Sequence, residues 1–165
     1  MEFANAAHRE TQRRVEEYLG ELFEDPYLDP ETSHFYVRYG TTVLEIAVDP
    51  YGPEDTMVQV MAYCVQGVRH EPDLLLGLLE LNHHLAFGAF SLVGRDIFLS
   101  HTLFGRGLDR GALLGAIAAV ANVADEYDDR IVAKYGGQTA LDRIRDTGGK
   151  KRRAGSRDPT ASHPR

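Results

Sequence analysis

The chain has 165 residues, of which 43% are hydrophobic and 26% charged, as in one ordinary globular domain. Its single cysteine, Cys64, excludes a disulfide framework and a four-cysteine zinc site. The net charge of −7 excludes a uniformly basic, phosphate-binding body, and we expect residues 1–147 to form one acidic domain.

Charge is divided unevenly along the chain. Residues 150–165 hold six basic side chains and one acidic side chain, whereas the preceding residues hold 24 acidic and 12 basic ones. We expect residues 148–165 to be a basic disordered tail, because they lack apolar side chains that could pack. The N-terminal residues contain no apolar stretch typical of a secretory signal, so we expect a cytoplasmic protein.

Residues 6–23 are predicted to form an amphipathic helix. Val15, Leu19 and Phe23 recur at helical spacing along one stripe, with charged residues elsewhere. Pro26 ends this segment, because proline disfavours helix in the residue before it.

Three strands are predicted next, over residues 34–39, 42–49 and 56–68. One face of the third strand is apolar and carries Val58, Val60, Ala62 and Cys64. Its other face is too apolar for a fully solvated surface and carries Met57, Gln59, Met61, Tyr63 and Val65. This second face is the first candidate binding surface.

A second helix is predicted over residues 71–85, a hairpin over 87–93 and 97–104, and a last helix over 109–135. Asp109 is a suitable cap for that helix, and Gly136 and Gly137 are expected to end it. The order α-β-β-β-α-β-β-α predicts an α+β fold in which one helical layer covers an antiparallel five-stranded sheet. A doubly wound parallel sheet needs crossover helices that this order lacks.

Catalytic motifs are weak. Glu80 and His83 have ligand spacing on a helix, but a di-iron site needs a second such pair. An acidic cluster on the last helix comprises Asp125, Glu126, Asp128 and Asp129. We expect no catalytic residue, metal site, cofactor or small-molecule substrate, although a metal-dependent enzyme using Glu80, His83 and the acidic cluster is a remaining alternative.

One segment resembles a known family. It reads LLELNHHLAFGAFSL over residues 78–92 and continues as DIFL over 96–99. Together with the order of elements over about residues 8–135, it resembles the YbjN-like domains, which share a fold with type III secretion chaperones. From the residues alone, we expect Asn82 to cap or satisfy carbonyls at the helix end and Gly88 to let the hairpin pack closely against that helix.

The resemblance implies a small acidic homodimer that holds an extended segment of a client protein. The leading hypothesis is therefore a non-enzymatic peptide- or protein-binding chaperone or adaptor. We place the client on Met57, Met61 and Tyr63, with help from residues of the first helix if that helix swings away: Val15, Leu19 and Phe23. The dimer is expected to form through the second helix together with the hairpin or the final helix.

The alternative is a dimeric regulatory protein whose basic tail contacts nucleic acid or an anionic membrane. Binding that weakens strongly with salt and disappears with the tail would distinguish it. The sequence leaves open whether the acidic cluster is functional or only solubilising.

Overall fold

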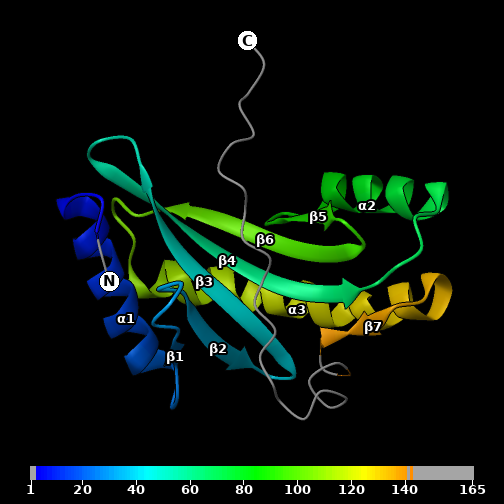
Figure 1. Ribbon diagram of the computed structural model, residues 1–165, viewed down its shortest axis with the longest axis horizontal. Coiled ribbons are helices and arrows are strands. Elements are labelled where there is room, and N and C mark those ends of the chain that lie inside the picture. The colour runs from blue at the N-terminus through cyan, green and yellow to red at the C-terminus, as the bar shows by residue number, and fades with distance from the viewer. Residues whose placement is uncertain (1–2, 141, 143–165) are drawn as a thin grey trace.

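A computed structural model describes residues 3–140 and 142. Within them the elements follow the order that Figure 1 shows: α1 (Ala6–Leu22), β1 (Tyr27–Leu28), β2 (Phe35–Tyr39), β3 (Thr42–Tyr51), β4 (Asp55–Gln66), α2 (Pro72–His84), β5 (Ala89–Val93), β6 (Asp96–Phe104), α3 (Arg110–Tyr135) and β7 (Gln138–Thr139). The three helices and the five longer strands were all predicted. The strand count was wrong, because two strands of two residues each bring the sheet of the described chain to seven.

The sheet is antiparallel throughout the described residues, with the order β1-β2-β3-β4-β6-β5. The short β7 pairs with the end of β4, where Thr139 lies opposite Val65. Strand β4 is therefore central, and its side chains are flanked by β3 on one side and β6 on the other.

The helices pack on one face of this sheet, which we call the inner face. Val15 and Leu19 of α1 and Ile117 of α3 are 0% exposed in one core with the strands. Figure 1 shows α3 running behind the strands. The inner-facing strand residues of the core include Phe35, Val37, Leu44, Ile46, Val48, Val58, Val60, Ala62, Cys64, Phe90, Ile97 and Leu99. The opposite side of the sheet is the outer face.

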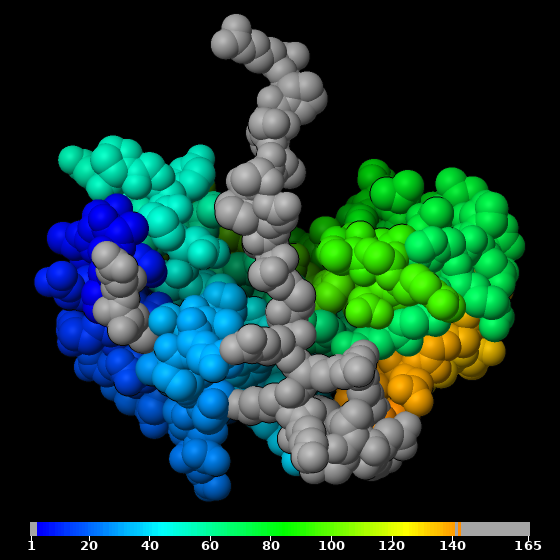
Figure 2. Space-filling model, viewed as in Figure 1, coloured from blue at the N-terminus to red at the C-terminus, as the bar shows by residue number. Residues whose placement is uncertain are grey.

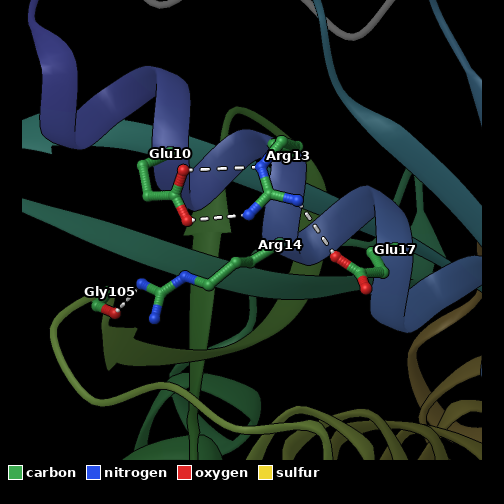
Figure 3. A network of polar contacts seen from close by, with 5 residues as sticks. All are labelled: Glu10, Arg13, Arg14, Glu17 and Gly105. Carbon is green, nitrogen blue, oxygen red and sulfur yellow. Dashed lines mark hydrogen bonds and ion pairs between the residues drawn. The ribbon is translucent and has the colours of Figure 1, made fainter.

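Helix α1 is fixed to the sheet by polar contacts around Gly105. Arg14 donates from Nη2 to the Gly105 carbonyl at 2.8 Å, and Thr56 Oγ1 donates to Thr11 Oγ1 at 2.9 Å. Figure 3 shows Arg14 reaching Gly105, while the neighbouring Arg13 pairs with carboxylates of its own helix. A side chain at position 105 would overlap Thr56, which explains glycine there.

Helix α2 is joined to β5 through Asn82. Its side chain accepts from the Phe90 N–H at 2.7 Å and donates to the Phe90 carbonyl at 3.1 Å. The expectation of a helix cap was wrong, because Asn82 satisfies strand groups rather than the carbonyls of its own helix. Gly88, with φ of +77°, lies close to β6 rather than α2: a Cβ there would be 3.0 Å from the Ser100 carbonyl oxygen.

The ends of α3 were correctly predicted. Asp109 caps its first turn by accepting from the Ala112 N–H at 2.7 Å. Gly136, at φ of +76°, follows the last residue, where a left-handed backbone favours glycine. This long helix thus spans the inner face and brings its acidic C-terminal half beside β7 and the end of β4.

Candidate functional site

The candidate site is a strip of apolar side chains along β4 on the outer face. Met57, Met61 and Tyr63 all project to this face and are half-buried, whereas Val58 and Val60 between them are 0% exposed on the inner face. The alternation of a strand places them there, as predicted. Val65 was also predicted on this face, but it is 0% exposed, because the β4–β6 register shifts between Tyr63 and Val65.

Aromatic residues of β6 widen the strip, and sequence analysis missed them. Phe98 lies opposite Tyr63 with ring centroids 4.5 Å apart, and Phe104 lies opposite Met57. Tyr51 adds a ring 5.7 Å from that of Phe104, and these two side chains are 51% and 62% exposed. Directly opposite residues of paired strands share a face. Knowledge of the β4–β6 register would therefore have placed Phe98 and Phe104 beside Tyr63 and Met57. We call Met57, Met61, Tyr63, Phe98 and Phe104 the apolar strip.

Carboxylates line the strip along β3. Glu45 lies opposite Met61 and Asp49 opposite Met57. Glu45 is only 6% exposed and accepts from Tyr36 Oη at 3.2 Å, and it lies 2.7 Å from His34 Nδ1. The hydrogen bond to Glu45 raises the pKa of His34 above its ordinary value. A buried carboxylate with these partners is well held and stays beside the strip.

An acidic pocket opens at the Tyr63 end of the strip. It has a volume of about 280 Å³, and its lining includes Tyr63 together with Asp125, Asp128 and Asp129 of α3 and Asp142. The pKa of Asp128 is raised to about 6, mainly by burial and in part by the neighbouring carboxylates, against the opposing effect of a hydrogen bond from the Asp129 backbone. The described residues that line this pocket include no lysine or arginine, so its potential favours a cationic side chain.

The predicted residues of α1 lie elsewhere. Val15 and Leu19 are 0% exposed in the core beneath the inner face, and Phe23 is half-buried against that core. The structure therefore brings together Met57, Met61 and Tyr63 and separates them from Val15, Leu19 and Phe23. A client can reach Val15 and Leu19 only after α1 leaves the sheet.

The residues considered for chemistry are not assembled. Cys64 is 1% exposed, and burial raises the pKa of its thiol to about 12, so it is not a nucleophile at neutral pH. Glu80 and His83 are exposed on α2 and do not line the acidic pocket. Over residues 3–140 and 142, no group of histidine, cysteine and acidic side chains has a metal-binding arrangement. No helix in the same part of the chain is long and apolar enough to cross a bilayer.

The fold is an α+β domain in which an antiparallel sheet carries its helices on one face. A family model described as "T3SS (YopN, CesT) and YbjN peptide-binding chaperone 1" matches residues 9–143. The chain belongs to this family, which confirms the resemblance drawn from residues 78–99.

Two solved structures share the fold. A chain of "Structure of the HopA1-SchA Chaperone-Effector Complex" has a TM-score of 0.60 at 11% identity, covering 76% of this chain and 98% of that chain. A chain of "Crystal Structure of the ExsC-ExsE Complex" has a TM-score of 0.55 at 12% identity, covering 77% and 96%. Comparison with curated proteins finds no significant match. Identities this low establish the fold alone.

Proposed function

We propose that the protein is a non-enzymatic cytoplasmic chaperone that holds an extended client segment on the apolar strip. The observation that carries this proposal is the row of Met57, Met61 and Tyr63 on the outer face of a sheet whose helices all pack within one core on the inner side. Membership in a family of peptide-binding chaperones supports it.

The strip suits an extended segment for physical reasons. An extended peptide presents alternate side chains to one surface, and the outward positions of β4 offer Met57, Met61 and Tyr63, with Gln59 between the two methionines. Methionine adapts its shape to different partners, while the aromatic rings of Phe98 and Phe104 give large apolar contact areas. The carboxylate of Asp49 beside the strip favours clients that carry basic residues between their apolar ones.

A homodimer is the second part of the proposal, through α2 and the adjoining β5. Figure 2 shows α2, in green, at the end of the molecule opposite α1, in blue. The exposed large apolar side chains of α2 and of the residues next to and in β5 are Leu75, Leu76, Leu79, Phe87 and Val93. Leu79 and Val93 are each 66% exposed. Large apolar side chains exposed in this number on α2 and at the ends of β5 are typical of a protein interface rather than of a solvated surface. Sedimentation at tens of micromolar should give a dimer for the natural chain and a monomer for Leu79→Asp.

Site-specific photo-crosslinking tests the client surface. A photoreactive amino acid replaces Met61 in one protein and Leu114, on the exposed side of α3, in a matched control. In nuclease-treated native lysate, position 61 should yield an adduct that maps to one contiguous client segment, and position 114 should not. Equal adducts at both positions would contradict the proposal, and adducts lost after nuclease treatment would favour the regulatory alternative.

A further inference from the structure

The described chain ends beside the apolar strip. Thr139 pairs opposite Val65 at the end of β4, and Thr139 Oγ1 donates to Asp142 Oδ2 at 2.9 Å. Asp142 lines the acidic pocket together with Tyr63, the last residue of the strip. The remaining 23 residues of the chain therefore start at one end of the outer face.

These residues are long enough to follow the strip. An extended chain advances about 3.3 Å per residue, so the eight residues from Asp142 to Lys150 reach about 26 Å. Tyr63 and Met57 are six residues apart on β4, which corresponds to about 20 Å. The basic residues that begin at Lys150 can thus reach both the acidic pocket and the whole strip.

Charge complements this geometry. The end of the chain carries four consecutive basic residues, Lys150 to Arg153, and has a net charge of +5 over residues 150–165. Asp49 lies on the outer face beside the strip, and the acidic pocket at the Tyr63 end is lined by Asp125, Asp128 and Asp129 of α3. Arg38 of β2 lies opposite Val43, toward the Tyr63 end of the outer face, and donates from Nε to the Gly40 carbonyl at 3.1 Å.

Composition sets how firmly such a segment can bind. Residues 148–165 include no leucine, isoleucine, valine, methionine or aromatic residue, so they cannot fill the apolar strip. Their attraction is mainly electrostatic, and it weakens with salt because ions screen charges over about 10 Å at 0.1 M. A client with both basic and large apolar residues would displace them.

We propose that the C-terminal segment, residues 148–165, docks on its own chain through the carboxylates of Asp49 and the acidic pocket, and so lies over the apolar strip until a client displaces it. The regulatory consequence rests on the proposed function, because it needs a client for the same surface. The docking itself does not, and it can be tested without any client.

Methionine NMR tests the docking in the full-length chain. The chain has three methionines, and two of them, Met57 and Met61, report on the strip. A nitroxide is attached after Ser156→Cys, because Cys64 is 1% exposed and its thiol is protonated at neutral pH. The methyl signals of Met57 and Met61 should lose most of their intensity relative to the reduced label.

Two matched variants test whether the broadening depends on the positive charge of the segment or only on its being tethered nearby. Reversing the four basic residues of 150–153 to glutamate should restore the methyl signals, as should 1 M salt, whereas Lys150→Arg with Lys151→Arg should leave the broadening intact. Unchanged methyl signals in the labelled chain would overturn the docking.

A mixed sample identifies the source of the segment. Equal broadening when the nitroxide and the methyl label are on different chains would also overturn the proposal, since a second copy would then supply the segment. Failure of this experiment leaves the client proposal intact, because crosslinking at position 61 does not depend on the C-terminal segment.

Discussion

Replacing Gly105 with alanine should disrupt the packing of α1 on the sheet and lower the stability of the fold. A Cβ there would lie 1.8 Å from Thr56 Oγ1 and 3.0 Å from Thr11 Oγ1. Both threonines are buried, at 0% and 3% exposure, and their hydroxyls share a 2.9 Å hydrogen bond. Gly105→Ala therefore breaks a buried hydrogen bond, at about 1–3 kcal/mol, and overpacks the site by a similar amount. We expect a loss of about 2–5 kcal/mol, a large part of the stability of a typical domain.

Urea unfolding followed by circular dichroism measures this loss. The matched control is Gly115→Ala in α3, where a Cβ meets no atom within 4 Å, and we expect it to stabilise the protein by up to about 1 kcal/mol. Adding Thr56→Ala to Gly105→Ala removes the overlapping hydroxyl, so the double variant should lose less stability than the two single losses together. A Gly105→Ala loss below about 0.5 kcal/mol, or strict additivity, would refute the reasoning.

Three further predictions concern Leu19, Asp128 and Cys64. Leu19→Ala should lower the free energy of unfolding by about 2–5 kcal/mol, since Leu19 is 0% exposed; a loss within error would show that α1 is not packed as described. Asp128 has a pKa raised to about 6 in the folded protein, so its contribution to stability is present below about pH 4 and is lost as the pH rises through 6. Asp128→Asn should therefore be more stable than the natural chain above pH 7, by an amount on the order of 1 kcal/mol after allowing for solvent screening, and equal to it near pH 3; parallel pH profiles would contradict this. The Cys64 thiol should react with a disulfide reagent at pH 8 only as fast as the protein unfolds, and rapid reaction of the folded protein would be inconsistent with its burial.

Local patterns predicted most of the fold. The alternation of Val58, Val60 and Ala62 identified the inner face of β4, and Asp109 and Gly136 identified the ends of α3. These signals depend only on neighbours along the chain. Strands β1 and β7 could not be predicted, because two residues are too few to show a period.

The site was only partly predictable, because two of the five residues of the apolar strip join it through strand pairing. Met57 and Met61 follow from alternation within one strand. Phe98 and Phe104 join them only through the β4–β6 register, and the shift after Tyr63 turned Val65 inward. Such pairings arise from the whole sheet, so a local pattern cannot contain them.

The hydrogen bonds of Asn82 to β5 and the close packing around Gly105 could not be predicted for a related reason. Asn82 satisfies the backbone of Phe90, eight residues away on another element, and Gly105 contacts Thr11 and Thr56 from two distant segments. Residue type alone indicated a cap for the first and gave no indication of the close approach at the second.

The affinity of the client for two matched variants tests the central claim most directly. Met61→Asp places a carboxylate in the middle of the apolar strip, and Leu114→Asp places one on the exposed side of α3. Titration calorimetry with the client segment mapped by crosslinking should show at least about a tenfold loss for Met61→Asp, which corresponds to about 1.4 kcal/mol, and little change for Leu114→Asp. Equal affinities of the natural chain and Met61→Asp, with both proteins folded, would contradict the assignment of the apolar strip as the client surface.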